Sequence, residues 1–189
     1  WSSKPIINAL SDLEHPCQAL ADFMTIKEEF GSFEDVTLTF IGDGNNVANS
    51  LILCGALLGS TIRIACPKGY EPNKDVIKKA KELNSKPNSL LITNDILHAV
   101  KGASVLYTDV WSSMGQEDSK ESKDKIFEGY SINKKLLDYA DNKAIVLHCL
   151  PAYRGKEISD EVIDSNQSRI FDQAENRMHA QQALLSYLV

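Results

Sequence analysis

The chain has 189 residues, 43% of them hydrophobic, which suits one sizeable α/β domain with short appendages and excludes a disordered or fibrous class. A formal net charge of −6, with only four arginines, argues against a broad basic surface for nucleic acid or an anionic membrane. No apolar run reaches the roughly 20 residues of a membrane-spanning helix, and the first residues lack the layout of a secretion signal. We therefore expect a small-molecule partner.

Cysteines are scattered along the chain without a C-x-x-C pair, which predicts reduced thiols in a cytoplasmic protein. They are Cys17, Cys54, Cys66 and Cys149. The chain begins at Trp1, in a stretch typical of the middle of a protein, so we expect a fragment or a processed product.

The first predicted element is a helix from about residue 14 to residue 30. Its apolar face, at helical spacing, is formed by Cys17, Leu20, Ala21 and Met24. Residues 36–66 then form a βαβ unit: a β-rich run, a glycine turn, an apolar helix and a second β-rich run. Asn45 or Asn46 is suited to cap the helix, and Gly59 is suited to end it.

Helices and strands continue to alternate after this unit. Helices are predicted at 74–83, 95–100 and 132–140, and strands at 89–93, 103–110 and 144–150. The polar stretch 116–125 is predicted to be a solvated loop or an exposed helix start. The last predicted helix runs from about residue 174 to residue 188. Its apolar face is formed by Ala180, Ala183, Leu184 and Tyr187.

Five strand-like runs separated by helices, several nearly continuous in Val, Ile and Leu, predict a doubly wound, Rossmann-like α/β fold. We expect a five-stranded parallel sheet with helices on both faces, plus a flanking helix at each end of the chain. With strand order 3-2-1-4-5, ligands bind at the carboxyl ends of the strands, where the order reverses. The strands concerned lead into GDGNN (42–46), DVWSSM (109–114) and HCLP (148–151), which should converge on one crevice.

The GDGNN turn has two interpretations. A dinucleotide-binding loop is disfavoured, because Val47 stands where the third glycine belongs and Cys66-Pro67 replaces the acidic residue that would hold a ribose. A tight turn followed by a helix cap explains most of the stretch. It leaves one of Asn45 and Asn46 unexplained, since only one asparagine can cap the helix.

Asp109 directly follows an apolar strand at the predicted switch point. A loop carboxylate in water is the alternative, but this position favours a ligand cation, and a carboxylate there suits an ammonium group. Ser113, Met114 and Gly115 add a hydroxyl, backbone donors and a hinge-like glycine.

His148-Cys149, at the end of the last strand, has two structural interpretations: a core thiol, and a histidine satisfied by backbone groups. A thiol becomes a base or a ligand mainly where neighbouring cations lower its pKa, and sequence alone does not reveal those neighbours. A zinc site is disfavoured because no second Cys or His falls at ligand spacing, so we predict no metal.

His15-Pro16-Cys17-Gln18 opens the first helix, with Pro16 suited to the first helical position and His15 to the N-cap. A capping-box-like arrangement of His15 and Gln18 is one interpretation. In the other, both side chains and the positive end of the helix dipole converge on an electron-rich oxygen. Arg177, in the last helix, is either a surface charge or a clamp for a carbonyl or a phosphate.

The strongest signal is a set of five motifs: HPCQALADFMTI, FIGDGNNVANS, TDVWSSMGQE, LHCLPAYRG and AENRMHAQQALL. In this order and at these separations they closely resemble the ornithine carbamoyltransferase family, from about residue 7 to the C-terminus. The resemblance implies transfer of the carbamoyl group of carbamoyl phosphate to the δ-amine of L-ornithine, giving L-citrulline and phosphate. It also implies no metal or organic cofactor, a homotrimeric full-length protein, and a role in arginine biosynthesis in the cytoplasm.

The resemblance assigns ornithine binding to Asn46, Asp109, Ser113 and Met114, with Asp109 holding the α-ammonium. The loop that contains Ser113 and Met114 would close over the amino acid.

The carbamoyl group is assigned to His15, Gln18 and Arg177, which match positions that contact its carbonyl and amide. Cys149 and Leu150 match the place where the two substrates meet, with backbone oxygens able to accept from the carbamoyl amine. These residues and Asp109 therefore suit attack by a neutral δ-amine and stabilisation of a tetrahedral oxyanion. In the family the bond between residues 150 and 151 is cis.

One departure from the family concerns phosphate. The family's Ser-x-x-Thr-Arg loop, which grips phosphate at a helix N-terminus, has no counterpart, and the nearest string, at 60–63, enters a strand. We therefore expect residues 1–32 to be an interdomain helix segment of a truncated carbamoyl phosphate domain. Residues 33–170 would be the ornithine-binding domain and residues 171–189 the C-terminal interdomain helix. Such a chain should be inactive, or nearly so, by itself.

Two alternatives stay open at this point. A sister transcarbamylase would act on aspartate or putrescine, and a non-catalytic module would bind ornithine without forming citrulline. Asp109 together with the following Ser-Met-Gly favours an α-amino acid cation over the other two amines.

Overall fold

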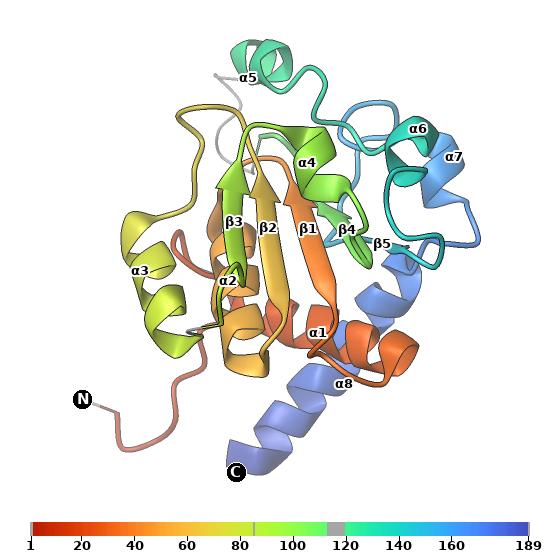
Figure 1. The fold of residues 1–189 in the computed structure, drawn as a ribbon. Helices are drawn as coiled ribbons and strands as arrows, with labels where there is room; N and C mark the ends of the chain where they lie inside the picture. Colours follow the sequence, from red (N-terminus) through yellow and green to blue (C-terminus); the bar gives the residue numbers. More distant parts are fainter. Residues whose placement is uncertain (1, 85, 113–119, 189) are drawn as a thin grey trace.

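A five-stranded parallel sheet runs through the middle of the molecule, in the order β3–β2–β1–β4–β5 (Figure 1). The computed structural model describes residues 2–84, 86–112 and 120–188. The strands are β1 (Thr37–Ile41), β2 (Thr61–Ala65), β3 (Leu90–Thr93), β4 (Val105–Thr108) and β5 (Ile145–His148). All neighbouring strands pair in parallel, with Leu38 of β1 opposite Ile62 of β2 and Val105 of β4. The predicted fold class and strand order are confirmed.

Helices lie between the strands and at both ends of the described chain. They are α1 (Pro16–Phe30), α2 (Asn46–Leu58), α3 (Lys74–Leu83), α4 (Ile96–Val100), α5 (Lys120–Ile126), α6 (Lys134–Leu137), α7 (Asp160–Ile163) and α8 (Ile170–Leu188). None of them has the length and apolar composition that crossing a membrane requires.

Two apolar cores cover the two faces of the sheet. Successive strand residues point to opposite faces, so Tyr107 belongs to one core and Leu106 to the other. The first core is closed by α1, α2 and α3, and the second by α4, α6 and α7. In Figure 1, α2 and α4 accordingly lie on opposite sides of the sheet.

The turn between β1 and α2 is shaped by its glycines. Gly42 has a φ of 149°, which a residue with a side chain rarely adopts. A Cβ atom on Gly44 would lie 2.4 Å from the backbone nitrogen of Pro72, so the turn packs directly against a neighbouring loop. Asn45 then caps α2 and Gly59 ends it in the left-handed conformation, as the sequence predicts.

The two flanking helices differ from prediction at their starts and faces. Helix α1 begins at Pro16 and α8 at Ile170, rather than near residues 14 and 174. Leu20, predicted to be buried, is 40% exposed, and Tyr187 is 87% exposed. Ala183 is also exposed, while Ala180 and Leu184 are only half-buried.

Polar residues explain why the buried faces of the flanking helices differ from the predicted apolar faces. The face of α8 that packs against α1 buries Gln173 and Asn176, and α1 buries Asp22 and Thr25 opposite them. Hydrophobic periodicity cannot find an interface built from hydrogen bonds, because the residues that make it score as surface residues.

Candidate functional site

A pocket of about 410 Å³ opens at the carboxyl ends of β1, β4 and β5, where the strand order reverses. The elements that meet there are the segment before α1, the first turn of α2, the turns after β4 and β5, and α8. Six residues expected from the sequence line it: His15, Asn46, Asp109, Cys149, Leu150 and Arg177. Such a crevice is where ligands bind in open parallel sheets.

The other three expected residues lie elsewhere. Gln18 is 1% exposed and lies beneath the pocket, where its side-chain oxygen accepts from Arg177. Ser113 and Met114 lie outside the described residues, as does the rest of the stretch 113–119.

The two asparagines of the GDGNN turn have separate roles. Asn45 caps α2, its side-chain oxygen accepting from the backbone N–H of Val47 at 3.0 Å, and its amide donates to Asp109 at 2.8 Å. Asn46 lines the pocket and donates to the backbone oxygen of Ser11 at 2.8 Å. The cap therefore also holds the pocket carboxylate, and the second asparagine is left facing the pocket.

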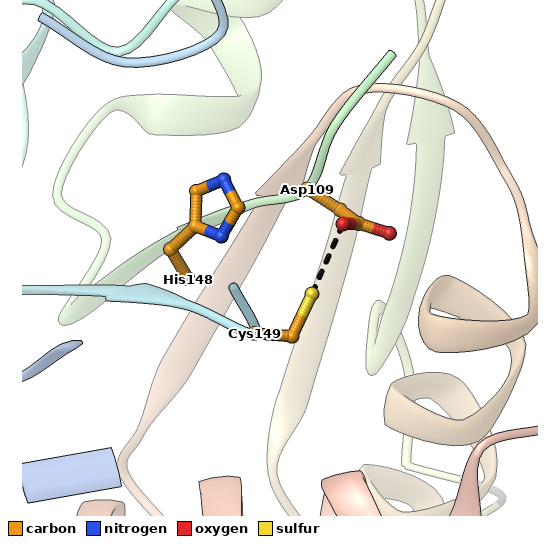
Figure 2. A group of neighbouring side chains, drawn as sticks. All are labelled: Asp109, His148 and Cys149. Atoms are coloured by element: carbon orange, nitrogen blue, oxygen red, sulfur yellow. Dashed lines mark hydrogen bonds between the residues drawn. The ribbon is translucent and has the colours of Figure 1, made fainter. Parts of the chain in front are cut away.

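Asp109 is 8% exposed and is held by three described donors, none of them charged. Besides Asn45, these are the backbone N–H of Val110 at 2.7 Å and the thiol of Cys149 at 3.0 Å. Figure 2 shows the thiol and the carboxylate facing each other across the ends of two neighbouring strands. The negative charge of Asp109 is thus fixed in position without being neutralised by these partners, which suits a cationic ligand.

Cys149 is a neutral thiol in this setting. Burial raises the pKa of the thiol well above its usual range, and the charge of Asp109 raises it further. A thiolate base or nucleophile is therefore disfavoured, and the sulfur acts as a hydrogen-bond donor.

His148 supports the turn that follows β5. Its Nδ1 accepts from the backbone N–H of Leu150 at 2.9 Å, so its Nε2 carries the proton and donates to Glu157 at 3.3 Å. The interpretation as a histidine satisfied by the backbone is confirmed for Nδ1, while Nε2 bonds to a buried carboxylate. The bond between Leu150 and Pro151 is cis, as the resemblance implies.

Three possible metal ligands gather at the same place. Ligand atoms of Asp109, His148 and Cys149 lie within 4.8 Å of one another (Figure 2). However, both ring nitrogens of His148 are already hydrogen-bonded, and the high pKa of the Cys149 thiol opposes the thiolate that a metal needs. These residues fit a metal poorly.

His15 is at the N-cap of α1, but its side chain does not cap the helix. The capping-box interpretation is wrong, because the Gln18 side chain bonds to Asp22 and Arg177 instead. Burial and the neighbouring Arg177 lower the pKa of His15, so the imidazole is neutral at pH 7. Its Nδ1 has no hydrogen-bond partner among the described residues.

Arg177 faces the same pocket from α8. Its Nη1 donates to Gln18, while its Nε has no partner among the described residues. Buried polar atoms are nearly always paired, so an unpaired imidazole nitrogen and an unpaired guanidinium nitrogen on residues lining one pocket suggest a polar ligand.

Sequence reasoning missed the residues that come from irregular segments. Leu10, Ser11 and Asp12, in the irregular segment before α1, line the pocket. Such segments have no periodicity, so nothing in the sequence pattern indicated their position.

Comparison with known proteins agrees with this geometry. Residues 34–188 match the family described as aspartate/ornithine carbamoyltransferase, Asp/Orn binding domain, and residues 1–28 match its carbamoyl-P binding domain. The ornithine carbamoyltransferase of Prochlorococcus marinus subsp. pastoris is 70% identical over all 189 residues, which span 61% of that protein. The chain thus spans about three fifths of the length of such curated relatives.

Solved structures show the same likeness. The ornithine carbamoyltransferase from Pyrococcus furiosus is 50% identical with a TM-score of 0.94, over 100% of this chain and 60% of that one. A mitochondrial ornithine carbamoyltransferase from Coccidioides immitis is 33% identical with a TM-score of 0.88, again over 100% and 60%. The chain therefore belongs to the aspartate/ornithine carbamoyltransferase family, and most of its length is the Asp/Orn binding domain.

Proposed function

We propose that this chain supplies the ornithine-binding half of an enzyme that transfers the carbamoyl group of carbamoyl phosphate to the δ-amine of L-ornithine. The products are L-citrulline and phosphate. The observation that carries the proposal is the pocket carboxylate of Asp109, held by neutral donors and facing the same cavity as His15 and Arg177.

L-Ornithine would bind with its α-ammonium on Asp109. Asn46 lines the pocket beside it, and its NH₂ group, which donates one hydrogen to Ser11, would offer the other to the amino acid. Ser113 and Met114, which lie outside the described residues, are proposed as further contacts from the loop after β4. This arrangement would hold the aliphatic chain so that the δ-amine points toward the end of β5.

The carbamoyl group would lie between the end of β5 and the start of α1. His15 and Arg177 would stabilise the oxyanion that develops when the amine attacks, and a neutral imidazole suits hydrogen bonding to an oxygen. Gln18 would act with Arg177, to which it is hydrogen-bonded. The backbone oxygens of Cys149 and Leu150 would accept from the carbamoyl amine.

The rate would come mainly from placing the two substrates in contact. Carbamoyl phosphate is already activated by its phosphate leaving group, so attack by a positioned neutral amine needs no metal or organic cofactor. Orientation of reactants and preorganised donors for the oxyanion are effects large enough to supply most of such a rate enhancement.

The proposed division of the chain follows from this scheme. Residues 1–32 would belong to the carbamoyl phosphate domain, residues 33–170 would form the ornithine-binding domain, and residues 171–189 would form the returning interdomain helix. We further propose that the full-length protein is a homotrimer that serves arginine biosynthesis in the cytoplasm. The four free cysteines fit a reducing compartment.

The test is calorimetric titration of L-ornithine into the full-length protein and its Asp109→Asn variant. If Asp109 pairs with the α-ammonium in a desolvated site, the substitution weakens binding by about 2 to 5 kcal/mol. Asp12→Asn is the matched control, because Asp12 lines the same pocket but is assigned no contact with the ammonium. Equal affinity of the Asp109→Asn variant and the wild type would overturn the assignment.

The same titration separates the alternatives. L-Aspartate carries a second carboxylate, which Asp109 repels, and putrescine lacks the α-carboxylate, so both should bind more weakly than L-ornithine. Ornithine binding without citrulline formation in the full-length protein would indicate the non-catalytic module instead.

A further inference from the structure

A buried carboxyl group lies behind the pocket, where α1 packs against α8. Asp22 is 0% exposed, and its Oδ1 accepts from the side-chain amide of Gln18 at 2.8 Å and from that of Gln173 at 2.6 Å. Its Oδ2 has no hydrogen-bond partner among the described residues. Burying such a group is costly, so its presence in a helix interface calls for a role that an apolar residue could not fill.

Asp22 influences the orientation of the two glutamine side-chain amides that donate to it. A primary amide has a donor at one end and an acceptor at the other, so an acceptor beside the NH₂ group decides which way the oxygen points. With its NH₂ on Asp22, Gln18 turns its oxygen to the guanidinium of Arg177. Gln173 places its NH₂ on Asp22 and, at 3.1 Å, on the hydroxyl of Tyr107, and turns its oxygen to the backbone N–H of His148, at 2.9 Å.

The alternative orientation of Gln18 would damage the pocket. If its amide rotated by about 180°, the NH₂ group would face the guanidinium of Arg177. Both groups are hydrogen-bond donors, so they could not bond to each other. Arg177 would then lose the hydrogen bond that holds its Nη1. Since Arg177 lines the pocket, its side chain would no longer be held at the place that the proposed function requires.

Both branches from Asp22 end at the pocket. One reaches Arg177 through Gln18, and the other reaches the end of β5, next to Cys149, through Gln173. We propose that Asp22 is a positioning residue, which orients both glutamine amides and so aligns Arg177 with the end of β5 for carbamoyl transfer. The inference rests on the proposed function, because only that function gives Arg177 a substrate to hold.

The environment of Asp22 agrees with a role as a fixed acceptor. Burial raises the pKa of Asp22 to about 7, while the hydrogen bonds from Gln18 and Gln173 act in the opposite direction. Oδ1 can accept from both amides whether or not Oδ2 carries a proton. The orientation of the amides therefore does not depend on the charge of Asp22.

The test compares three variants of the full-length protein. Asp22→Leu removes the acceptor, whereas Asp22→Asn keeps one side-chain oxygen that can accept from both amides. Thr25→Val is the matched control, because Thr25 accepts from Asn176 at 3.0 Å in the same α1–α8 interface but has no described link to Arg177. If the leucine variant does not fold, Asp22→Ala removes the acceptor without adding bulk.

Steady-state kinetics should separate positioning from stability. We expect Asp22→Leu to lower kcat/KM for carbamoyl phosphate about tenfold or more, because a small displacement of a substrate-holding group has effects of this size or larger. Asp22→Asn and Thr25→Val should stay within about threefold of the wild type. Wild-type constants in the folded leucine or alanine variant, or an equal loss in Thr25→Val, would overturn the inference.

A crystal structure of the leucine or alanine variant tests the positioning role of Asp22 separately from the proposed function. Absence of citrulline formation by the wild type would defeat the proposed function, and the structure would then decide the role of Asp22. A Gln18 oxygen turned away from Arg177 would support the positioning role. A Gln18 oxygen that still accepts from Arg177, as in the wild type, would refute it.

Discussion

At the scale of single residues, neighbours decide the chemistry of the two side chains at the end of β5. The sequence leaves open whether Cys149 acts through its sulfur or its backbone. In the structure the thiol donates to Asp109 and burial keeps its pKa high, so the sulfur positions the carboxylate and does not attack. His148 likewise supports the turn through Leu150 and Glu157 rather than binding a ligand.

Asp22 gives a prediction about pH at this scale. Burial raises the pKa of Asp22 in the folded state from its ordinary value of 3.8 to about 7, so between these two pH values the folded state holds a proton that the unfolded chain has released. The favourable contribution of Asp22 to the free energy of unfolding is therefore complete below about pH 4 and is lost as the pH rises through about 7. At 1.36 kcal/mol per pH unit, the loss is on the order of 4 kcal/mol.

Denaturant unfolding of the wild type and the Asp22→Asn variant, in parallel from pH 4 to pH 8, measures this effect. The free energy of unfolding of the wild type should fall relative to that of the variant as the pH rises. Because other titrating groups act alike in both proteins, the difference isolates Asp22. A difference that does not change with pH would show that the carboxyl group is not held protonated.

At the scale of elements, the turn from β1 into α2 shows how a structural motif also builds the pocket. The sequence interpretation of GDGNN as a tight turn with a cap is correct. The structure adds that Gly44 packs against the backbone around Pro72 and that Asn45 binds Asp109. The same turn therefore places Asn46 at the pocket and holds the carboxylate that follows β4.

Gly44→Ala should therefore affect both stability and binding. The new Cβ atom would lie 2.4 Å from the nitrogen of Pro72 and 2.6 Å from the carbonyl oxygen of Tyr70. Forcing the two loops apart should destabilise the fold by about 1 to 3 kcal/mol and weaken L-ornithine binding.

Gly59→Ala, at the other end of α2, provides the control. Gly59 has a φ of 79° and open space around it, so alanine there strains the backbone without moving the pocket. Calorimetry should show unchanged ornithine affinity for Gly59→Ala and reduced affinity for Gly44→Ala. Equal affinities in the two variants would show that the turn does not position the site.

At the scale of the whole molecule, the pocket is built from both ends of the chain. Residues before and at the start of α1 form one side, and Arg177 of α8 reaches the same cavity. The two helices pack against each other and are joined by buried polar contacts, including Gln173 to Asp22. Apolar side chains on α8, such as Phe171 and Met178, are largely exposed in this chain.

The chain by itself should bind L-ornithine but form almost no citrulline. The pocket offers groups that can bind the amino acid and the carbamoyl group. The sequence has no counterpart of the family's Ser-x-x-Thr-Arg loop, which binds the phosphate. Without donors on the phosphate, carbamoyl phosphate would be neither bound tightly nor oriented for attack. A radiochemical assay should give less than about 1% of the full-length rate; a rate near that of the full-length protein would contradict the proposed division of labour.

From the sequence alone, periodicity and turn chemistry determined the parallel sheet and the capped turn, and the usual strand order of such sheets placed a ligand crevice at their carboxyl edge. Six of the residues that line the pocket were assigned through the resemblance of the sequence motifs to the carbamoyltransferase family. The tertiary structure alone decided the protonated state of Cys149, the supporting role of His148 and the polar α1–α8 interface around Asp22. The reason is physical: pKa values and amide orientations depend on which atoms surround a group in space, and residues far apart in the chain, such as Asp22 and Gln173, meet only after folding.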